Sequence, residues 1–487
     1  MDREEKPSSD ETTSSPEVST RVVKLHPRAA GADADALYEV RQKVYPRAVS
    51  GRFAAWRWAL VWLTQLVFYG LCWLPWNDRQ AVLFDLAERK FYVFGWVFWP
   101  QDVFFLAILL IICAYSLFLF TAVAGRLWCG YACPQTVYTE IFIWIEKLVE
   151  GDRARRMKLD AAGASFRKIL LKAVKYGAWV AVALWTGVSF VGYFSPVREL
   201  LSGLINFSAG GWEIFWILFY GGFTYLMAGV MREQVCKYMC PYARFQGVMF
   251  DPDTLVITYD EERGEPRGSR RKGVAVAGQG DCVDCGICVQ VCPTGIDIRQ
   301  GLQYECIGCA ACIDACDQVM DKVELPRGLI RYSTENAIRK HWGRGDIIRH
   351  VLRPRILIYV TVLCAICIAF VWGLTTRKPL RMDVIKDRTV LVREVEGSLL
   401  ENVYILHVMN MAEQPRHLRL GVSGIEGVTL DGQSEIEMLP AQNKTLTVRV
   451  RVPLDTLTKG AHQVFFDLQA EDDSSLRLHE KAVFIAP

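Results

Sequence analysis

Histidine is scarce in this 487-residue chain, and none of it lies in the long apolar runs. The seven histidines are all in polar segments, at His26, His341, His350, His407, His417, His462 and His479. Because no histidine lies in these runs, a bis-histidine haem inside a membrane is excluded, and because no Cys-x-x-Cys-His motif occurs, a covalent c-type haem is excluded as well. The chain also lacks a Walker-type phosphate loop and a dinucleotide fingerprint. We therefore expect neither nucleotide hydrolysis nor direct hydride transfer.

The chain also has no large excess of either basic or acidic residues. The formal net charge is only +3, from 56 basic and 53 acidic residues, and this balance gives no reason to expect a nucleic-acid partner. With 52% hydrophobic residues the chain cannot be mostly disordered. Residues 1–50 are the exception that we predict to be a disordered N-terminal tail, because residues 1–22 are rich in Ser, Thr, Glu and Pro. This segment shows no signal-peptide pattern.

Long apolar runs are abundant, and five of them approach the 20 or so residues that cross a bilayer as a helix. They are Trp56–Trp76, Gln101–Ala124, Ile169–Phe194, Trp212–Val230 and Ile356–Thr375. Buried helices of a soluble core are the alternative, but stretches such as FFLAILLIICAYSLFLFTAV carry no polar stripe. We predict a polytopic α-helical membrane bundle of five spans. The aromatic segment Phe91–Pro100 either lies in the membrane interface or extends the second span.

The orientation follows from the basic residues near the ends of the spans, because loops on the inner side are enriched in Lys and Arg. Such residues are dense before the first span, between the second and third, and between the fourth and fifth, whereas the other side has only Arg79, Arg89, Lys90 and Arg198. We therefore expect the N-terminus inside the cell and the C-terminal domain outside.

Composition divides the rest of the chain. Residues 51–250 hold four spans, and residues 251–355 are polar and rich in cysteine, which predicts a cytoplasmic domain inserted before the fifth span at 356–376. Residues 377–487 alternate apolar and polar side chains, as in VYILHV and LTVRVRV, with turn formers between the runs. This pattern predicts an immunoglobulin-like antiparallel β-sandwich. It contains no cysteine, so no disulfide supports it.

The inserted domain carries two runs of four cysteines with the spacing C-x-x-C-x-x-C-x-x-x-C. Such a pair of runs is typical of bacterial two-cluster ferredoxins, in which the fourth cysteine of each run binds the other cluster. The predicted ligands of cluster 1 are Cys282, Cys285, Cys288 and Cys316, and those of cluster 2 are Cys306, Cys309, Cys312 and Cys292. Zinc is the alternative, because C-x-x-C also occurs in zinc sites. We predict two [4Fe–4S] clusters.

Two further cysteine pairs share the motif C-x-x-x-C-P, namely Cys129 with Cys133 and Cys236 with Cys240. Each pair follows a span, and its proline should turn the second cysteine away from helical geometry. Thiolates are soft ligands that suit Cu(I). We expect these cysteines to bind copper, and a more specific hypothesis is that the two pairs form one site of four thiolates. The alternative is that the four cysteines only fill contacts between helices. Cys72, Cys113, Cys364 and Cys367, all within spans, are interpreted as structural.

At these residues the chain resembles the CcoG/FixG/RdxA family, membrane iron–sulfur proteins associated with the assembly of cbb(3)-type cytochrome c oxidase. The resemblance rests on the strings GRLWCGYACPQTVYTE, IEKLVEGDR and CKYMCPYARFQGVMFDPDTLVITYD, and on the double ferredoxin run. It implies a multi-pass protein of the bacterial inner membrane, with its N-terminus and ferredoxin domain cytoplasmic and its C-terminal domain periplasmic.

The resemblance also implies an activity, the reduction of Cu(II) to Cu(I) for the copper centre of the oxidase. In that family the C-x-x-x-C-P cysteines handle copper, and here they are Cys129, Cys133, Cys236 and Cys240. The implied partners are copper, membrane lipid, oxidase subunits or copper chaperones, and a cytoplasmic electron donor that the sequence does not name. Two other functions stay open: a ferredoxin-type quinol dehydrogenase subunit, and a non-catalytic oxidase assembly scaffold.

Overall fold

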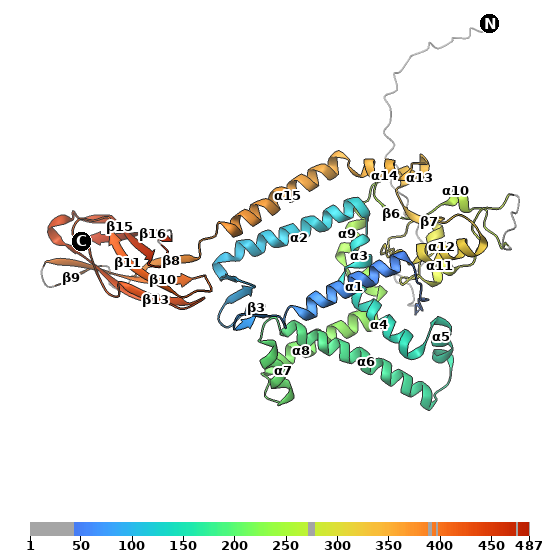
Figure 1. Cartoon of the computed structure of the whole chain (residues 1–487), viewed down its shortest axis with the longest axis horizontal. Helices are drawn as coiled ribbons and strands as arrows, with labels where there is room; N and C mark the ends of the chain where they lie inside the picture. Colours follow the sequence, from blue (N-terminus) through green and yellow to red (C-terminus); the bar gives the residue numbers. More distant parts are fainter. Residues whose placement is uncertain (1–42, 271–277, 388–391, 396–397, 474–475, 487) are drawn as a thin grey trace, which may run out of the picture. The chain divides into compact units, whose positions relative to one another are not determined.

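The computed structural model describes residues 43–270, 278–387, 392–395, 398–473 and 476–486. Its internal contacts divide the chain into two units, and each unit combines segments that are distant in the sequence (Figure 1). The cluster unit contains residues up to 54, residues 121–127 and residues 236–352. The helix–sandwich unit contains residues 55–120, 128–235 and 353–487.

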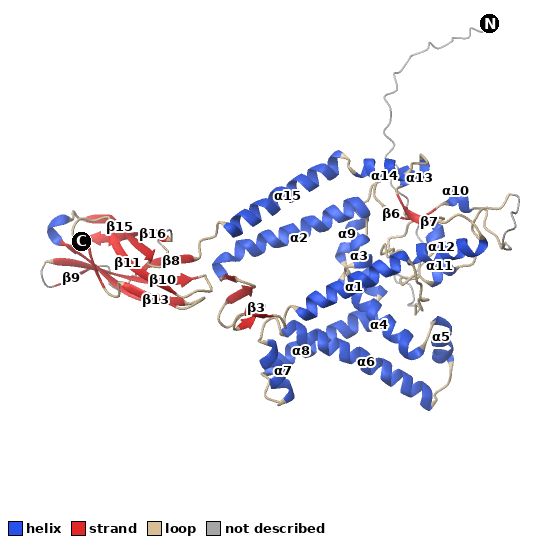
Figure 2. Ribbon diagram, viewed as in Figure 1, coloured by secondary structure: helices blue, strands red, loops and turns tan. Residues whose placement is uncertain are grey.

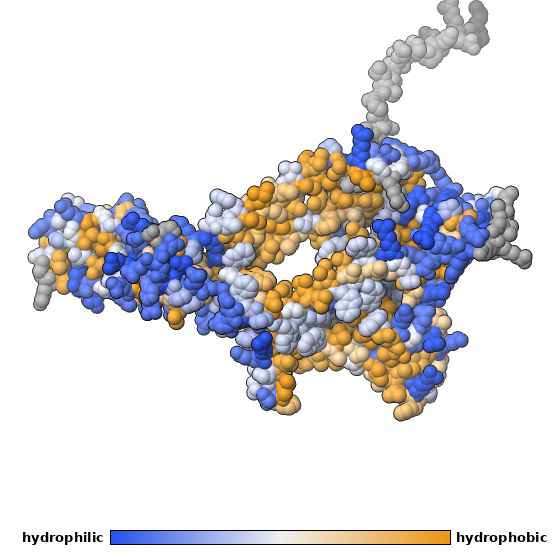
Figure 3. Space-filling model, in the orientation of Figure 1, coloured by the Kyte–Doolittle hydropathy of each residue, from blue (hydrophilic) through white to orange (hydrophobic). Residues whose placement is uncertain are grey.

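Four helical segments in the described chain are long and apolar enough to cross a membrane. They are Pro100–Ala124, which includes α2 (Val103–Ala124); Phe166–Val191, which is α6; Gly211–Met231, formed by α8 (Gly211–Thr224) and the π-helix η2 (Tyr225–Met231); and Pro354–Thr375, which is α15. Their outward surfaces are largely apolar, as the orange surface of Figure 3 shows. Four of the five predicted spans thus appear as helices of this kind.

The predicted first span differs from the expectation. Its helix, α1 (Arg52–Gly70), ends six residues before Trp76 and is not among the four membrane-length apolar helices. Arg57 and Gln65 lie within it and lower its apolar character. The structure therefore supports four membrane-crossing helices and not clearly five.

Small residues and aromatic rings pack the long helices together. In α6, a Cβ atom added at Gly187 would lie 2.3 Å from the carbonyl oxygen of Ile217 in α8, so only glycine permits this close approach. Between α2 and α15, the rings of Phe105 and Phe370 meet edge to face with centroids 6.0 Å apart. Two different packing modes therefore hold these two helix pairs.

Residues 75–98 form short strands, which the sequence did not predict. Pro75–Trp76 (β1) pairs with Arg79–Gln80 (β2), and Val82–Asp85 (β3), Lys90–Val93 (β4) and Trp96–Phe98 (β5) form a three-stranded antiparallel sheet. Of the two alternatives for Phe91–Pro100, the extension of the second span is therefore wrong. Valine and aromatic residues, which are enriched in strands, favour strands here over a helix.

The C-terminal residues form two packed antiparallel sheets, drawn in red in Figure 2. One sheet has the order β12-β14-β10-β8 with β9 beside β10, and the other has the order β13-β11-β15-β16. The strands are β8 (Leu380–Lys386), β9 (Arg393–Val395), β10 (Leu399–Asn410), β11 (Arg416–Ser423), β12 (Thr429–Asp431), β13 (Glu435–Met438), β14 (Asn443–Pro453), β15 (Gly460–Ala470) and β16 (Arg477–Ala486). Alternate side chains such as Tyr404, Val448 and Phe466 fill the core. The predicted sandwich is confirmed.

The cluster unit combines short helices with a two-stranded sheet. Its strands are β6 (Val256–Tyr259) and β7 (Ile330–Ser333). Its helices are α9 (Pro241–Met249), α10 (Glu261–Gly264), α11 (Ile287–Gln290), η4 (Ile298–Gln300), α12 (Ala311–Val323), α13 (Glu335–Arg339) and α14 (Arg344–Val351). Ile257, Ile298, Met320 and Ile330 form its apolar core together with Cys282.

Only residues 43–50 of the predicted disordered tail can be compared with the structure. Residues 1–42 lie outside the described residues, but residues 43–50 contact the cysteine-rich loops. The N–H of Arg47 donates to the carbonyl oxygen of Gln290 at 2.8 Å, and the side chain of Val44 lies next to Gly295. Disorder is therefore the wrong expectation for residues 43–50, because these contacts order them.

Candidate iron–sulfur and thiol sites

The eight ferredoxin-type cysteines line two small cavities of the cluster unit. Cys282, Cys285, Cys288 and Cys316 line one cavity together with Tyr259 and Arg299. Cys292, Cys306, Cys309 and Cys312 line the other with apolar neighbours such as Ile296 and Ile307, and Cys288 lines both cavities. The structure thus brings together four sulfurs from distant parts of the sequence in each place.

Left-handed backbone positions shape the loops between these cysteines. Gly286 (φ 62°) and Gly308 (φ 70°) each lie between two cysteines of a run, where glycine adopts this conformation without strain. Ala310 (φ 59°) takes the same conformation directly before α12. The chain then enters α12, which carries Cys312 and Cys316 one turn apart. These loop conformations therefore allow the cysteines of each run to line the cavities described above.

The chemistry of this donor set fits iron–sulfur clusters. Burial raises the pKa of the Cys288 thiol to about 11 and that of Cys306 and Cys316 to about 12. Only a strongly bound cation can keep such thiols ionised at neutral pH. In the described chain, no three His, Cys, Asp or Glu side chains lie close enough to hold a single metal ion. A cluster of four irons spreads its thiolates more widely than one ion does.

The first C-x-x-x-C-P pair lies where two short helices meet. Cys129 is within α3 (Leu127–Tyr131), and Cys133 is the extended residue (ψ 128°) that precedes α4 (Pro134–Glu150). The hydroxyl of Thr136 donates to the carbonyl oxygen of Cys129 at 2.6 Å and so ties α4 back to α3. The predicted effect of the proline is confirmed at Cys133.

The second pair has the same local design. Cys236 is within the π-helix η3 (Val235–Met239), and Cys240 is the extended residue (ψ 108°) before Pro241 and α9. The two pairs belong to different units, with Cys129 and Cys133 in the helix–sandwich unit and Cys236 and Cys240 in the cluster unit. The expectation that all four sulfurs form one site stays a prediction.

A buried group of charges leads into the second pair, and sequence reasoning missed it. Glu146 in α4 accepts hydrogen bonds from Arg232 at 2.7 Å and Arg156 at 2.9 Å, and lies 3.8 Å from Lys175. Lys175 also lies 3.1 Å from Glu150. These five side chains have exposed fractions of 9% or less. The spacing of Glu146 and Glu150, one turn apart on a helix, was the available signal.

This charge network fixes the backbone before Cys236. Arg232 follows η2 in a left-handed conformation (φ 46°), and its guanidinium is held by Glu146. The amide of Gln135, two residues after Cys133, donates to the carbonyl oxygens of Met227 at 2.9 Å and Arg232 at 3.1 Å. Both carbonyls also accept a backbone N–H, from Arg232 at 2.8 Å and from Val235 at 3.2 Å, so Gln135 adds a second donor to each. Burial alone would raise the pKa of Glu146, but Arg232 and the neighbouring cations hold it below its usual range.

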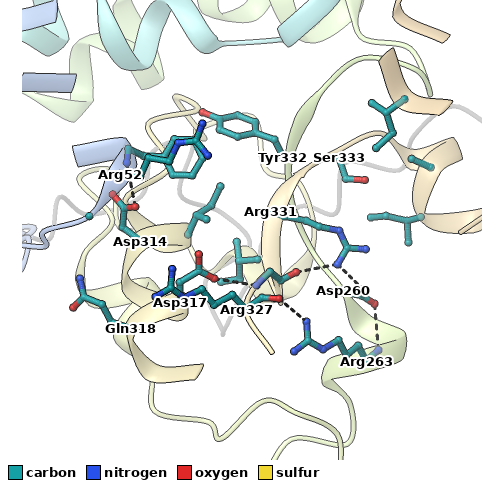
Figure 4. Close-up of a pocket in the computed structure, with 18 of the residues that line it drawn as sticks. Arg52, Asp260, Arg263, Asp314, Asp317, Gln318, Arg327, Arg331, Tyr332 and Ser333 are labelled. Carbon is teal, nitrogen blue, oxygen red and sulfur yellow. Dashed lines mark hydrogen bonds and ion pairs between the residues drawn. The ribbon is translucent and has the colours of Figure 1, made fainter. Parts of the chain in front are cut away.

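A cleft of about 1040 Å³ lies beside the first cysteine cavity. Ile330 lines both the cleft and this cavity. Figure 4 shows the cleft's charged wall, where Arg331 donates to Asp260 at 2.8 Å and Asp317 accepts the N–H of Gly328 at 3.0 Å. On another side, Asp314 accepts the N–H groups of Phe53 at 3.1 Å and Ala54 at 2.7 Å. Asp314 therefore caps the first turn of α1.

Comparison with known proteins agrees with this geometry. Three family models match: a 4Fe–4S binding domain over residues 106–151, a 4Fe–4S dicluster domain over residues 231–335, and the Ig-like fold at the C-terminus of FixG over residues 370–487. The nitrogen fixation protein FixG of Rhizobium meliloti is 40% identical, over 92% of this chain and 93% of its own length. The chain belongs to the FixG/RdxA family.

Other relatives divide between this family and a shorter protein type. The protein RdxA of Cereibacter sphaeroides is 37% identical, over 90% of this chain and 95% of its own length. A methylamine utilization ferredoxin-type protein, MauN of Methylorubrum extorquens, is 29% identical over only 36% of this chain and 49% of its own length. The FixG/RdxA relatives are thus matched over nearly their whole length, sandwich included.

One cysteine of the predicted spans lies in a buried position. The Cys72 thiol donates to the carbonyl oxygen of Tyr69 at 3.4 Å. This contact is consistent with the structural role expected for Cys72.

Proposed function

We propose that this protein is a membrane electron-transfer protein that reduces Cu(II) to Cu(I). Two [4Fe–4S] clusters, when bound, supply one-electron redox chemistry. Cys282, Cys285, Cys288 and Cys316 would hold cluster 1, and Cys306, Cys309, Cys312 and Cys292 would hold cluster 2. The observation that carries this assignment is the pair of cavities lined by these cysteines, which share Cys288.

The thiols of Cys129, Cys133, Cys236 and Cys240 would bind the copper substrate. Thiolate ligands favour Cu(I) over Cu(II), so binding there makes the reduction more favourable. One electron reduces one Cu(II) ion to Cu(I), and no proton is transferred in this step. The absence of histidine from these two motifs is consistent with such a reaction. The extended conformations of Cys133 and Cys240 support this role, because they present each thiol at a helix end.

The proposed setting is the bacterial inner membrane, with the N-terminus and cluster domain on the cytoplasmic side and the sandwich in the periplasm. The basic residues around the spans support this orientation. The proposed purpose is to supply Cu(I) for the copper centre of a cbb(3)-type oxidase, with oxidase subunits or copper chaperones as acceptors. The electron donor would be a cytoplasmic reductant.

The experiment is a comparison of copper reduction by purified, anaerobically reduced protein with and without the four thiols. We expect the variant with Ser at positions 129, 133, 236 and 240 to lose Cu(I) formation, measured with a Cu(I)-specific chelator, and to keep about eight irons per chain. A variant with Ser at Cys113 and Cys364, which lie on exposed faces of α2 and α15, is the control. Unchanged copper reduction in the four-thiol variant would remove these residues from the mechanism.

A ferredoxin-type quinol dehydrogenase subunit is the second candidate. The partial match to the methylamine utilization ferredoxin-type protein MauN supports a ferredoxin-type electron-transfer role. Reduction of the clusters by quinol in membranes, with no copper reduction, would decide for this function.

A further inference from the structure

Arg126 connects one cluster-binding loop to the helix that follows the second thiol motif. It stands between α2 and α3, three residues before Cys129, and its exposed fraction is only 6%. Its guanidinium donates to the carbonyl oxygens of Tyr304 and Ala243 and lies 3.5 Å from that of Cys306. Ala243 is three residues after Cys240. One buried cation therefore touches the loop of cluster 2 and the helix that begins at Cys240.

Backbone packing reinforces this contact. A Cβ atom added at Gly308 would lie 3.1 Å from the carbonyl oxygen of Arg126, and Gly308 has φ 70°. Glycine thus allows the loop between Cys306 and Cys309 to lie directly against the backbone of Arg126. The side chain and the main chain of Arg126 both hold this loop.

The charge of Arg126 also distinguishes the two clusters. Within the described chain its hydrogen-bond acceptors are main-chain carbonyls, and no carboxylate forms an ion pair with it. Arg299, which lines the cavity of cluster 1, is instead paired with Asp297 at 2.8 Å and with Asp284 at 2.5 Å. These side chains sum to a positive charge beside cluster 2 and to a negative charge beside cluster 1. A positive charge favours the reduced, more negative state of a cluster.

We propose that Arg126 is a positioning residue that raises the reduction potential of cluster 2 above that of cluster 1 and ties the loop of cluster 2 to the helix that follows Cys240. This inference rests on the proposed function and gives its electron path a direction. Cluster 1 is the entry side, because Cys285 is exposed and accessible to a donor. Cluster 2 is the exit side, because its loop shares Arg126 with the helix that follows Cys240.

The test is a redox titration of the purified full chain, followed by electron paramagnetic resonance, for Arg126→Gln, Arg126→Lys and the control Arg299→Gln. Arg126→Gln should lower the equilibrium constant for reduction of cluster 2 about tenfold, which is about 59 mV for a one-electron couple. Arg126→Lys keeps the charge, so its equilibrium constant for reduction of cluster 2 should stay within about threefold of that of the unmodified protein. Arg299→Gln should shift the other cluster's transition, which assigns the two signals.

Three results would overturn the inference. They are unchanged potentials in Arg126→Gln, an equal shift of both clusters, and a loss in Arg126→Lys as large as that in Arg126→Gln. The last result, together with lost iron, would mean that Arg126 has a structural role alone. Copper reduction by the four-thiol Ser variant tests the proposed function separately, so failure of one proposal is distinguishable from failure of the other.

Discussion

The buried carboxylate of Glu146 should contribute several kilocalories per mole to the free energy of unfolding. The change Glu146→Gln keeps the shape of the side chain but removes the negative charge that Arg232, Arg156 and Lys175 surround. Removing one partner of a buried ion pair leaves uncompensated charge and costs about 3–5 kcal/mol. The cost here should lie near the lower end, about 3 kcal/mol, because Glu150 still compensates Lys175 at 3.1 Å.

The assay is unfolding of the detergent-solubilised protein at neutral pH, with Glu88→Gln as the matched control. Glu88 also pairs with a lysine, Lys90 at 3.3 Å, but its side chain is 66% exposed, so its loss should cost less than about 1 kcal/mol. The contribution of Glu146 should be present above the ordinary pKa of a carboxyl group and disappear as pH falls through its lowered pKa. Equal losses of stability in both variants would refute this reasoning.

Two further predictions concern the start of α1 and the contact between α6 and α8. Asp314→Ala should remove the cap of α1 and lower the free energy of unfolding by about 1–2 kcal/mol. It should also speed amide hydrogen exchange at Phe53 and Ala54. Unchanged exchange at these two residues would contradict the capping role. Gly187→Leu should separate α6 from α8 and lower the thermal midpoint, because a Cβ atom there would meet the Ile217 carbonyl. Gly177→Leu in the same helix should be tolerated, because a Cβ atom at Gly177 has no atom within 4 Å. Equal effects of the two leucines would argue against close helix packing.

The parts of the fold that repeat a local pattern could be predicted from the sequence. The strands around Tyr404 and Val448 follow strict alternation, and two glycines lie between cysteines at the spacing that cluster loops need. The extended conformations of Cys133 and Cys240 follow from the proline after each of them. In each case the determining residues are neighbours in the sequence.

The parts that depend on distant residues could not be predicted. Glu146 and Arg232 are 86 residues apart, and nothing local indicates that they pair. The contact of Arg126 with the loop of Cys306 spans 180 residues. The short sheet around Phe91 was missed because its aromatic residues suit a membrane interface as well as a strand. The predicted first span was too long because aromatic residues beyond Gly70 extend its apolar run.

The most direct test of the central claim is a count of electrons. Chemically reduced protein, freed of excess reductant without oxygen, is mixed with Cu(II), while cluster absorbance and Cu(I) formation are followed together. The account predicts about two Cu(I) ions per chain, one for each reduced cluster, formed as fast as the clusters are oxidised. Clusters that stay reduced in the presence of Cu(II) bound to the protein would contradict it.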